Sequence, residues 1–437
     1  MNSVFKLSSS RWALLAAFGF VAAGITPAAA ADLGGDCCAD LEERVAELEA
    51  TTARKGNRKV SLTVSGWVNE AVMYWNDGTE SNSYVGTNKL EQSRVRFVGE
   101  AQIIPGWSAG YTLELGITGG SSNTWDQSNP DGSGNNSVTV RKSSWFIKSK
   151  DLGKVTVGQD GTALYHTLDD ADGVNTRNFS DAQAAAVYQG SFKLRSNGAF
   201  VNGLGWNNIL QGVDNGTVGQ DGRRNVVRYD SPTIAGFTLT ASWGEDDDWG
   251  MSLNYTNKWG DFQVLAKAGY GENSDENIGC ADKGSSSPFA QGTHCEIFGT
   301  AATIQHVPTG LYVYGGYAQN VDDNIRNFDP AAENKSTMYF IQGGIEQKWI
   351  PLGKTTIFGE YRHDDGGSKM SASFDGSHLQ STSLNFVGAG VVQNIEPAAM
   401  DLYVMYRHAD GDITNAANTN VDLDAFDSVI MGGLIRF

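Results

Sequence analysis

Apolar and polar residues alternate along most of the chain from residue 59 onward. In the segment 60–75, Val60, Leu62 and Val64 fall on one face of an extended chain, and Ser61 and Thr63 fall on the other. A period of two predicts β-strands whose two faces meet different environments. Sixteen such runs occur, at residues 60–75, 92–104, 108–118, 138–149, 153–159, 222–231, 235–243, 249–258, 261–271, 295–307, 310–319, 336–349, 354–363, 382–395, 399–408 and 426–437.

The segments that connect these runs alternate between short and long. Seven are tight and contain Pro, Gly or Asp, such as Pro105-Gly106 and Pro351-Leu352, and the eight others are mostly long and polar. A soluble β-sandwich has no reason to gather its short turns at one end, whereas a transmembrane barrel has short periplasmic turns and long external loops. The sequence therefore predicts an all-β membrane protein, a 16-stranded antiparallel transmembrane β-barrel over residues 59–437.

Three tryptophans lie beside predicted short turns, namely Trp107, Trp259 and Trp349. Aromatic side chains concentrate at the two interfaces of a membrane barrel. We therefore expect these indoles to form part of an interfacial girdle; ordinary core packing is the alternative for each one taken alone.

The first thirty residues have the features of a secretory signal. The positively charged Lys6 and Arg11 precede an apolar run over 12–25, and Pro27 precedes the small residues 28–31. The run is shorter than the roughly 20 residues that span a bilayer, which disfavours an uncleaved anchor. We predict a signal peptide over 1–30 and a periplasmic segment over 31–58 that contains a short helix near 41–50. Its two heptads suit either a coiled coil or a simple surface helix.

Composition and motifs exclude several classes of function. The chain has 32 Lys and Arg against 50 Asp and Glu, a formal charge of −18, and a polyanion such as nucleic acid requires clustered cations. Gly353-Lys354-Thr355 lacks the earlier glycine of a phosphate-binding loop, and the acidic run 169–173 lacks the ligand spacing of an EF-hand. No G-x-S-x-G or H-E-x-x-H motif occurs. We therefore expect no enzyme activity, no cofactor, no metal site and no nucleic-acid partner.

Several segments resemble one protein family. The C-terminal run ends in Phe437, which is similar to the assembly signal of bacterial outer-membrane barrels. Four other segments resemble the general diffusion porins of α-proteobacteria. They are residues 32–38, the acidic stretch 41–50, Lys59 to Gly66 (KVSLTVSG) and Asp230 to Leu239 (DSPTIAGFTL). This resemblance implies a homotrimer in the bacterial outer membrane, in contact with lipid and lipopolysaccharide, that passes small hydrophilic solutes and ions.

The same resemblance implies a third external loop, residues 160–221, that folds inward and narrows the channel. Acids on the loop and arginines on the facing wall would create a transverse field that orients dipolar solutes. The family pattern carries over best to Arg94 and Arg141, and strand parity alone supports the other arginines. The candidate constriction residues are Arg94, Arg96, Arg141, Arg224, Arg228, Arg362, Arg407, Asp160, Asp169, Asp170 and Asp172.

Two alternatives apply to this loop. A charged residue there can simply solvate the loop or pair with a neighbour, which is our interpretation of Asp181. The loop is also long for a compact constriction, so we expect part of it, around residues 192–201, to form an extra external hairpin.

Four cysteines suit an oxidising compartment. Cys280 and Cys295 bracket one external loop, and we predict a disulfide between them. For Cys37 and Cys38 the sequence leaves open a link between subunits, a local pair or free thiols.

These observations together predict a water-filled outer-membrane channel for passive diffusion. One alternative is a substrate-selective channel with an aromatic track along the lumen, for which Trp145 on the polar face of the fourth strand is the only hint. Another alternative is an outer-membrane adhesin, which would not conduct.

Overall fold

Sixteen strands form a closed antiparallel barrel in the computed structural model, which describes residues 60–131, 137–179, 188–210, 218–244, 247–274, 294–323, 325–366 and 373–437. The chain divides into two compact units, Met1–Thr51 and Thr52–Phe437, and the barrel belongs to the second. The predicted signal peptide (1–30) and the segment 31–58 lie outside the described residues. The barrel strands are β1 (Ser61–Asn76), β3 (Arg94–Ile104), β4 (Trp107–Thr118), β5 (Ser137–Ser149), β6 (Gly153–Gly161), β9 (Arg223–Asp230), β10 (Phe237–Gly244), β11 (Asp248–Trp259), β12 (Phe262–Asn273), β13 (Cys295–His306), β14 (Leu311–Asp322), β15 (Lys335–Ile350), β16 (Gly353–Gly366), β18 (Ser377–Ile395), β19 (Met400–Asn415) and β20 (Asn420–Arg436).

The barrel closes where the first strand meets the last. β1 pairs with β20 from Trp67↔Arg436 to Asn76↔Asp427, and with β3 from Ser61↔Glu100 to Trp67↔Arg94. The terminal Phe437 completes the seam, because its backbone exchanges hydrogen bonds of 3.0 and 3.1 Å with Gly66. A Cβ at Gly66 would lie 2.2 Å from the Arg94 carbonyl oxygen and 2.7 Å from the Phe437 ring, so only glycine fits at this point of the seam.

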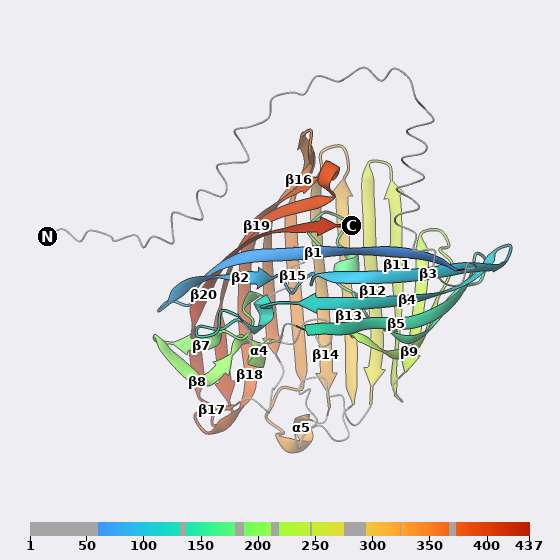
Figure 1. Ribbon diagram of the computed structural model, residues 1–437. Helices are drawn as coiled ribbons and strands as arrows, with labels where there is room; N and C mark the ends of the chain where they lie inside the picture. The colour runs from blue at the N-terminus through green and yellow to red at the C-terminus, as the bar shows by residue number, and fades with distance from the viewer. Residues whose placement is uncertain are drawn as a thin grey trace. The chain divides into compact units, whose positions relative to one another are not determined.

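Each predicted strand is confirmed, and the largest differences lie at the long-loop end. β19 continues to Asn415 and β20 begins at Asn420, inside the predicted loop 409–425. The many polar residues of these parts are typical of a loop, although alternation continues in β20, where Asn420, Asp422 and Asp424 alternate with Val421, Leu423 and Ala425. In Figure 1, β1, β3, β4 and β5 run across the view while β14 and β15 behind them run up and down, as the tilt of strands in a closed barrel requires.

Further short elements lie in the loops. β2 (Ser81–Thr87) pairs with the outer half of β1, β7 (Lys193–Ser196) pairs with β8 (Ala199–Gly205), and β17 (Ser373–Phe374) pairs with β18. The β7–β8 hairpin is the extra hairpin predicted near 192–201. The described helices are all single turns: η1 (Ser122–Thr124), η2 (Asp169–Ala171), α4 (Trp206–Ile209), α5 (Ile325–Phe328) and η3 (Glu396–Ala398). No helix in the described residues is long and apolar enough to cross a bilayer.

The two faces of the barrel wall differ as alternation requires. On β14, Leu311 and Val313 are exposed, whereas Tyr312 and Tyr314 are buried. Trp107, Trp259 and Trp349 are exposed at the short-turn end of the barrel, where a girdle of aromatic side chains belongs. The outer surface is therefore apolar and the inner one carries the polar groups.

The interior of the barrel contains a hydrophobic core. Buried side chains of the segment 168–218 pack against inward residues of β1 and of β14 to β20. Phe192 lies 4.9 Å from both Trp75 and Phe426, measured between ring centroids, and the Phe179 ring stacks on Tyr403 at 4.5 Å. Part of the barrel's cross-section is thus filled with protein, and the β3–β6 side remains polar.

Candidate channel constriction

The segment after β6 turns into the barrel and follows its inner wall. The Ala163 backbone binds β10 and β11, since its N–H donates to Ser242 Oγ (2.8 Å) and its carbonyl accepts from Ser252 Oγ (2.7 Å). Lys267 of β12 then donates from Nζ to the Tyr165 carbonyl and to Asp170 Oδ2, both at 2.9 Å. Each inward polar residue along these strands therefore holds the next stretch of the loop.

The same arm reaches the opposite wall. Asn175 donates from its backbone N–H to Glu346 on β15 (2.9 Å) and from its side-chain amide to Asp401 on β19 (3.0 Å). Thr176 donates to Gln342 at 2.9 Å. Residues 162–176, which we call the inner arm, are thus fixed to successive strands from β10 to β19.

The second half of the loop lies at the long-loop end. Arg195 on the β7–β8 hairpin binds Asp77 (2.6 Å) and Glu80 (2.5 Å), which follow β1. The backbone N–H groups of Asn197 and Gly198 donate to Asp424 on β20 at 3.0 and 2.7 Å. The β7–β8 hairpin is therefore fixed to the β1–β20 side of the barrel mouth.

Glu114 on β4 is the centre of the polar wall. Its carboxylate accepts from Arg96 Nε at 2.6 Å and from Arg141 Nε at 2.8 Å, and Arg94 Nη1 lies 3.5 Å away. Arg94 also binds Glu91 at 2.8 Å and lies over the Trp67 ring. Three arginines thus share two carboxylates, and the cluster keeps one positive charge in excess.

A bulge in β5 turns two consecutive cations toward the lumen. The pairing with β4 shifts between Glu114 and Leu115, so that Lys142 faces Glu114 while Val140 faces Leu115, and Arg141 is the extra residue between them. Arg141 and Lys142 therefore both reach the lumen: Arg141 binds Glu114, and Lys142 Nζ binds Asp160 at 2.7 Å.

Below this cluster the wall has a polar hollow of about 210 Å³, which we call the wall hollow. Tyr165 of the inner arm lies at its edge, with its ring 5.6 Å from Lys142 Nζ. Arg228 connects the hollow to the loop, because its Nη1 donates to the Gly161 and Thr162 carbonyls at 3.2 and 3.4 Å. The hollow is lined by Arg96, Val98, Thr112, Lys142, Lys154, Thr156, Asp160 and Arg228.

The other predicted arginines lie apart from this hollow in buried ion pairs. Arg224 binds Asp221 and Asp248 (2.8 and 2.5 Å), Arg362 binds Asp364 (2.5 Å), and Arg407 binds Glu360 (2.5 Å). The side chain of Arg407 is 1% exposed, against 36% for Arg96. The cations that line the hollow are therefore Arg96, Lys142, Lys154 and Arg228 rather than all seven predicted arginines.

The predicted acids also divide into buried and accessible groups. Asp170 is accessible and binds Lys267 and Arg177, whereas Asp169 and Asp172 are buried. Burial alone would raise the pKa of Asp169, but His166 and Arg177 outweigh it and hold that pKa well below its usual range. Burial raises the pKa of Asp172 to about 7. Hydrogen bonds from Thr176 and from the Val174 N–H lower this pKa, because they favour the ionised form, but burial has the larger effect. Asp160 lies on the wall rather than on the loop.

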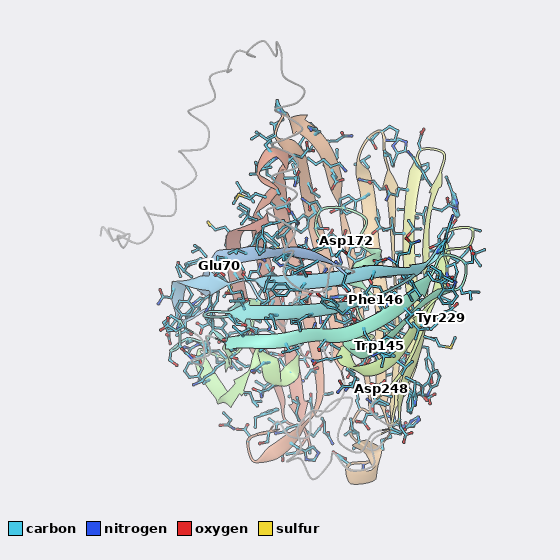
Figure 2. The ribbon with its side chains drawn as sticks, turned by 45° about the vertical axis from the view of Figure 1, so that its right-hand side comes forward. Glu70, Trp145, Phe146, Asp172, Tyr229 and Asp248 are labelled. Atoms are coloured by element: carbon cyan, nitrogen blue, oxygen red, sulfur yellow. The ribbon has the colours of Figure 1, made fainter. Side chains whose placement is uncertain are left out.

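The prediction that Trp145 lies on the polar, inward face of its strand was wrong. Trp145 pairs with Tyr111 and Val157 on the outward face and is half exposed, while its neighbour Phe146 pairs with Thr156 and is buried (Figure 2). Trp145 therefore gives no support to an aromatic track in the lumen. Three wall residues were missed. Glu114 and Lys154 alternate with apolar residues in the sequence, a signal that could have found them, whereas Lys142 is turned inward only by the bulge.

Cys295, at the start of β13, is disulfide-bonded. Cys280, Cys37, Cys38 and Asp181 lie outside the described residues, so the pairing of Cys280 with Cys295 stays a prediction.

Known proteins share both the sequence pattern and the fold. The family model of the Gram-negative porin matches residues 13–426. An anion-selective porin from Comamonas acidovorans aligns over 86% of this chain and 100% of its own, with 15% identity and a TM-score of 0.55. A loop L8 deletion mutant of OmpT, an outer membrane protein of Vibrio cholerae, aligns over 87% and 100%, with 13% identity and a TM-score of 0.53. Pseudomonas putida OprB aligns over 91% and 97%, with 10% identity and a TM-score of 0.52. No curated protein matches the sequence.

A closed 16-stranded barrel with an apolar outer face, a polar wall and a loop folded inside defines an outer-membrane channel protein. The chain belongs to the Gram-negative porin family. It is a bacterial outer-membrane protein that forms a channel for passive diffusion.

Proposed function

We propose that the protein is a general diffusion porin of the α-proteobacterial type, and that solutes pass between the inner arm and the wall formed by β3 to β6 and β9. One observation carries this: the loop buries apolar side chains against β1 and β14 to β20, while charged groups on the opposite wall stay accessible. Water and ions require a polar path, so the β3–β9 side is where they cross.

Within this path, Arg96, Lys142, Lys154 and Arg228 act on the solute directly. Arg94 and Arg141 act through Glu114, because their guanidinium groups are buried and hold that carboxylate in place. Asp170 supplies the accessible acidic side of the field from the inner arm. Arg224, Arg362 and Arg407 hold the loop and the wall together in buried pairs.

We further propose that the protein functions as a homotrimer, contacts lipid and lipopolysaccharide through its outer face, and has no enzymatic role. OmpT of Vibrio cholerae, whose trimer form has the same fold at a TM-score of 0.50, supports the trimer by analogy. A signal peptide over residues 1–30 and a periplasmic segment over 31–58 complete the proposed organisation.

Single-channel recording in a planar bilayer tests this proposal. Purified, heat-modifiable protein should give large ohmic steps that come in groups of three. Small currents blocked by one sugar would favour the substrate-selective channel. Correctly folded protein that gives no current would contradict a porin and favour the outer-membrane adhesin.

A further inference from the structure

The wall hollow contains one cation without a direct ion pair, although Asp230, its cross-strand partner, and Asp160 lie close enough to interact with it electrostatically. Arg96, Lys142 and Arg228 are paired with Glu114, Asp160 and Asp230 respectively. Lys154 differs from them: its Nζ lies 4.9 Å from the Phe146 ring centroid, and among the described residues it makes no hydrogen bond or ion pair. An ammonium group over an aromatic face keeps its N–H donors available to a ligand.

A hydroxyl beside Lys154 is also without a partner. Thr156 is 1% exposed, and its Oγ1 has no hydrogen-bond partner within the described part of the chain. Buried hydroxyls are nearly always hydrogen-bonded, so an unpaired one indicates a group that is missing from the site. Thr156 stands two positions after Lys154 on β6, and both residues therefore point to the same face of the strand.

We propose that the wall hollow is a binding subsite for a small oxyanion of the size of phosphate, with Lys154 and Thr156 as its principal contacts. The volume of about 210 Å³ equals roughly seven water molecules, which leaves room for one such ion and a few waters. The inference rests on the proposed function, since the ion reaches the hollow only if the channel is open.

Two carboxylates oppose an anion here, and their bonds to other groups reduce their effect. Asp230, the cross-strand partner of Lys154, is bound by Arg228 at 2.7 Å. Asp160 accepts from Lys142 Nζ, Ser144 Oγ and the Gly161 N–H, each at 2.7 Å. The lining itself contains four cations and one carboxylate whose oxygens are already bound. Charge-assisted hydrogen bonds from Lys154 and the accessible arginine and lysine groups favour an oxyanion over a neutral solute.

The test is block of the single-channel chloride current by inorganic phosphate at constant ionic strength. Lys154→Gln should raise the half-blocking concentration about tenfold, as expected for a lost hydrogen bond to a charged group, and Thr156→Val about threefold. Lys148→Gln is the matched control, because Lys148 is the cross-strand partner of Lys154, binds Glu100 and does not line the hollow. It should change the half-blocking concentration less than about twofold.

The possible outcomes distinguish failure of the proposed subsite from failure of the proposed channel function. Currents in chloride without phosphate block in the wild type would overturn the subsite and leave the porin intact, whereas absence of current would overturn the proposed function. Equal effects of Lys154→Gln and Lys148→Gln would reduce the hollow to a general positive field and overturn the subsite. If Lys154→Gln does not fold, Thr156→Val decides, because it is nearly isosteric and removes a hydroxyl that has no partner.

Discussion

Glu114→Gln should shift the ion preference of the channel toward anions. The change keeps the shape of the side chain and removes one negative charge from a cluster of Arg94, Arg96, Arg141, Glu91 and Glu114. The charge of that cluster rises from one positive to two. A passing cation is therefore repelled more strongly and a passing anion less.

The geometry sets the size of this effect. Thr112 lines the wall hollow and lies two residues before Glu114 on β4, which corresponds to about 7 Å along the strand. One unit charge at that distance in water changes the energy of a monovalent ion by about 0.6 kcal/mol, and screening at 0.1 M salt halves it. Because cation and anion move in opposite directions, the anion-to-cation permeability ratio should rise about threefold.

Reversal potentials in a salt gradient measure this ratio directly. Glu396→Gln is the matched control, since that exposed carboxylate binds Lys348 beside a short turn, away from the hollow. An unchanged ratio in Glu114→Gln, or an equal change in both variants, would refute the assignment of the path to this wall. Heat-modifiable migration of both variants shows that the barrel is folded, which matters because breaking a buried ion pair costs up to about 3–5 kcal/mol.

Three further outcomes follow from the loop. Burial raises the pKa of Asp172 from 3.8 to about 7, so the packed loop is favoured with the carboxyl protonated, and about 4 kcal/mol of its stability is lost as pH rises from about 4 to about 7; current noise should grow from pH 5 to pH 7.5 in the wild type and stay constant in Asp172→Asn. Lys267→Met should give a larger or noisier single-channel conductance, because the Tyr165 carbonyl and Asp170 lose their anchor on β12. Mass spectrometry of peptides before and after reduction should show Cys280 joined to Cys295, and any other partner for Cys295 would contradict the predicted disulfide.

Alternation sufficed to predict the sixteen strands because each barrel strand separates lipid from water over its whole length. It was not followed into the external parts of β19 and β20, where the many acidic and amide side chains indicated a loop although polar and apolar residues still alternate. It also failed after the extra residue at Arg141, since one inserted residue exchanges the faces that follow, and Trp145 was therefore assigned to the lumen.

The charged candidates were harder to rank than the strands. Parity indicates that Arg228 and Arg407 both face inward, but it cannot show that Arg407 is buried against Glu360 while Arg228 meets water. Such differences arise from contacts between residues far apart in the sequence, including the course of the inner arm along β10 to β19. Three-dimensional packing, rather than local pattern, decides which charges act on a solute.

The seam between Gly66 and Phe437 has a consequence for biosynthesis. The seam joins β1 to β20, so the barrel closes only in a chain that contains both strands. Until β20 is available, β1 exposes a row of unpaired backbone groups, and such an edge is prone to aggregate with other chains. The complete polypeptide must therefore be kept apart from its copies after export, and a chain truncated before β20 should be degraded rather than inserted.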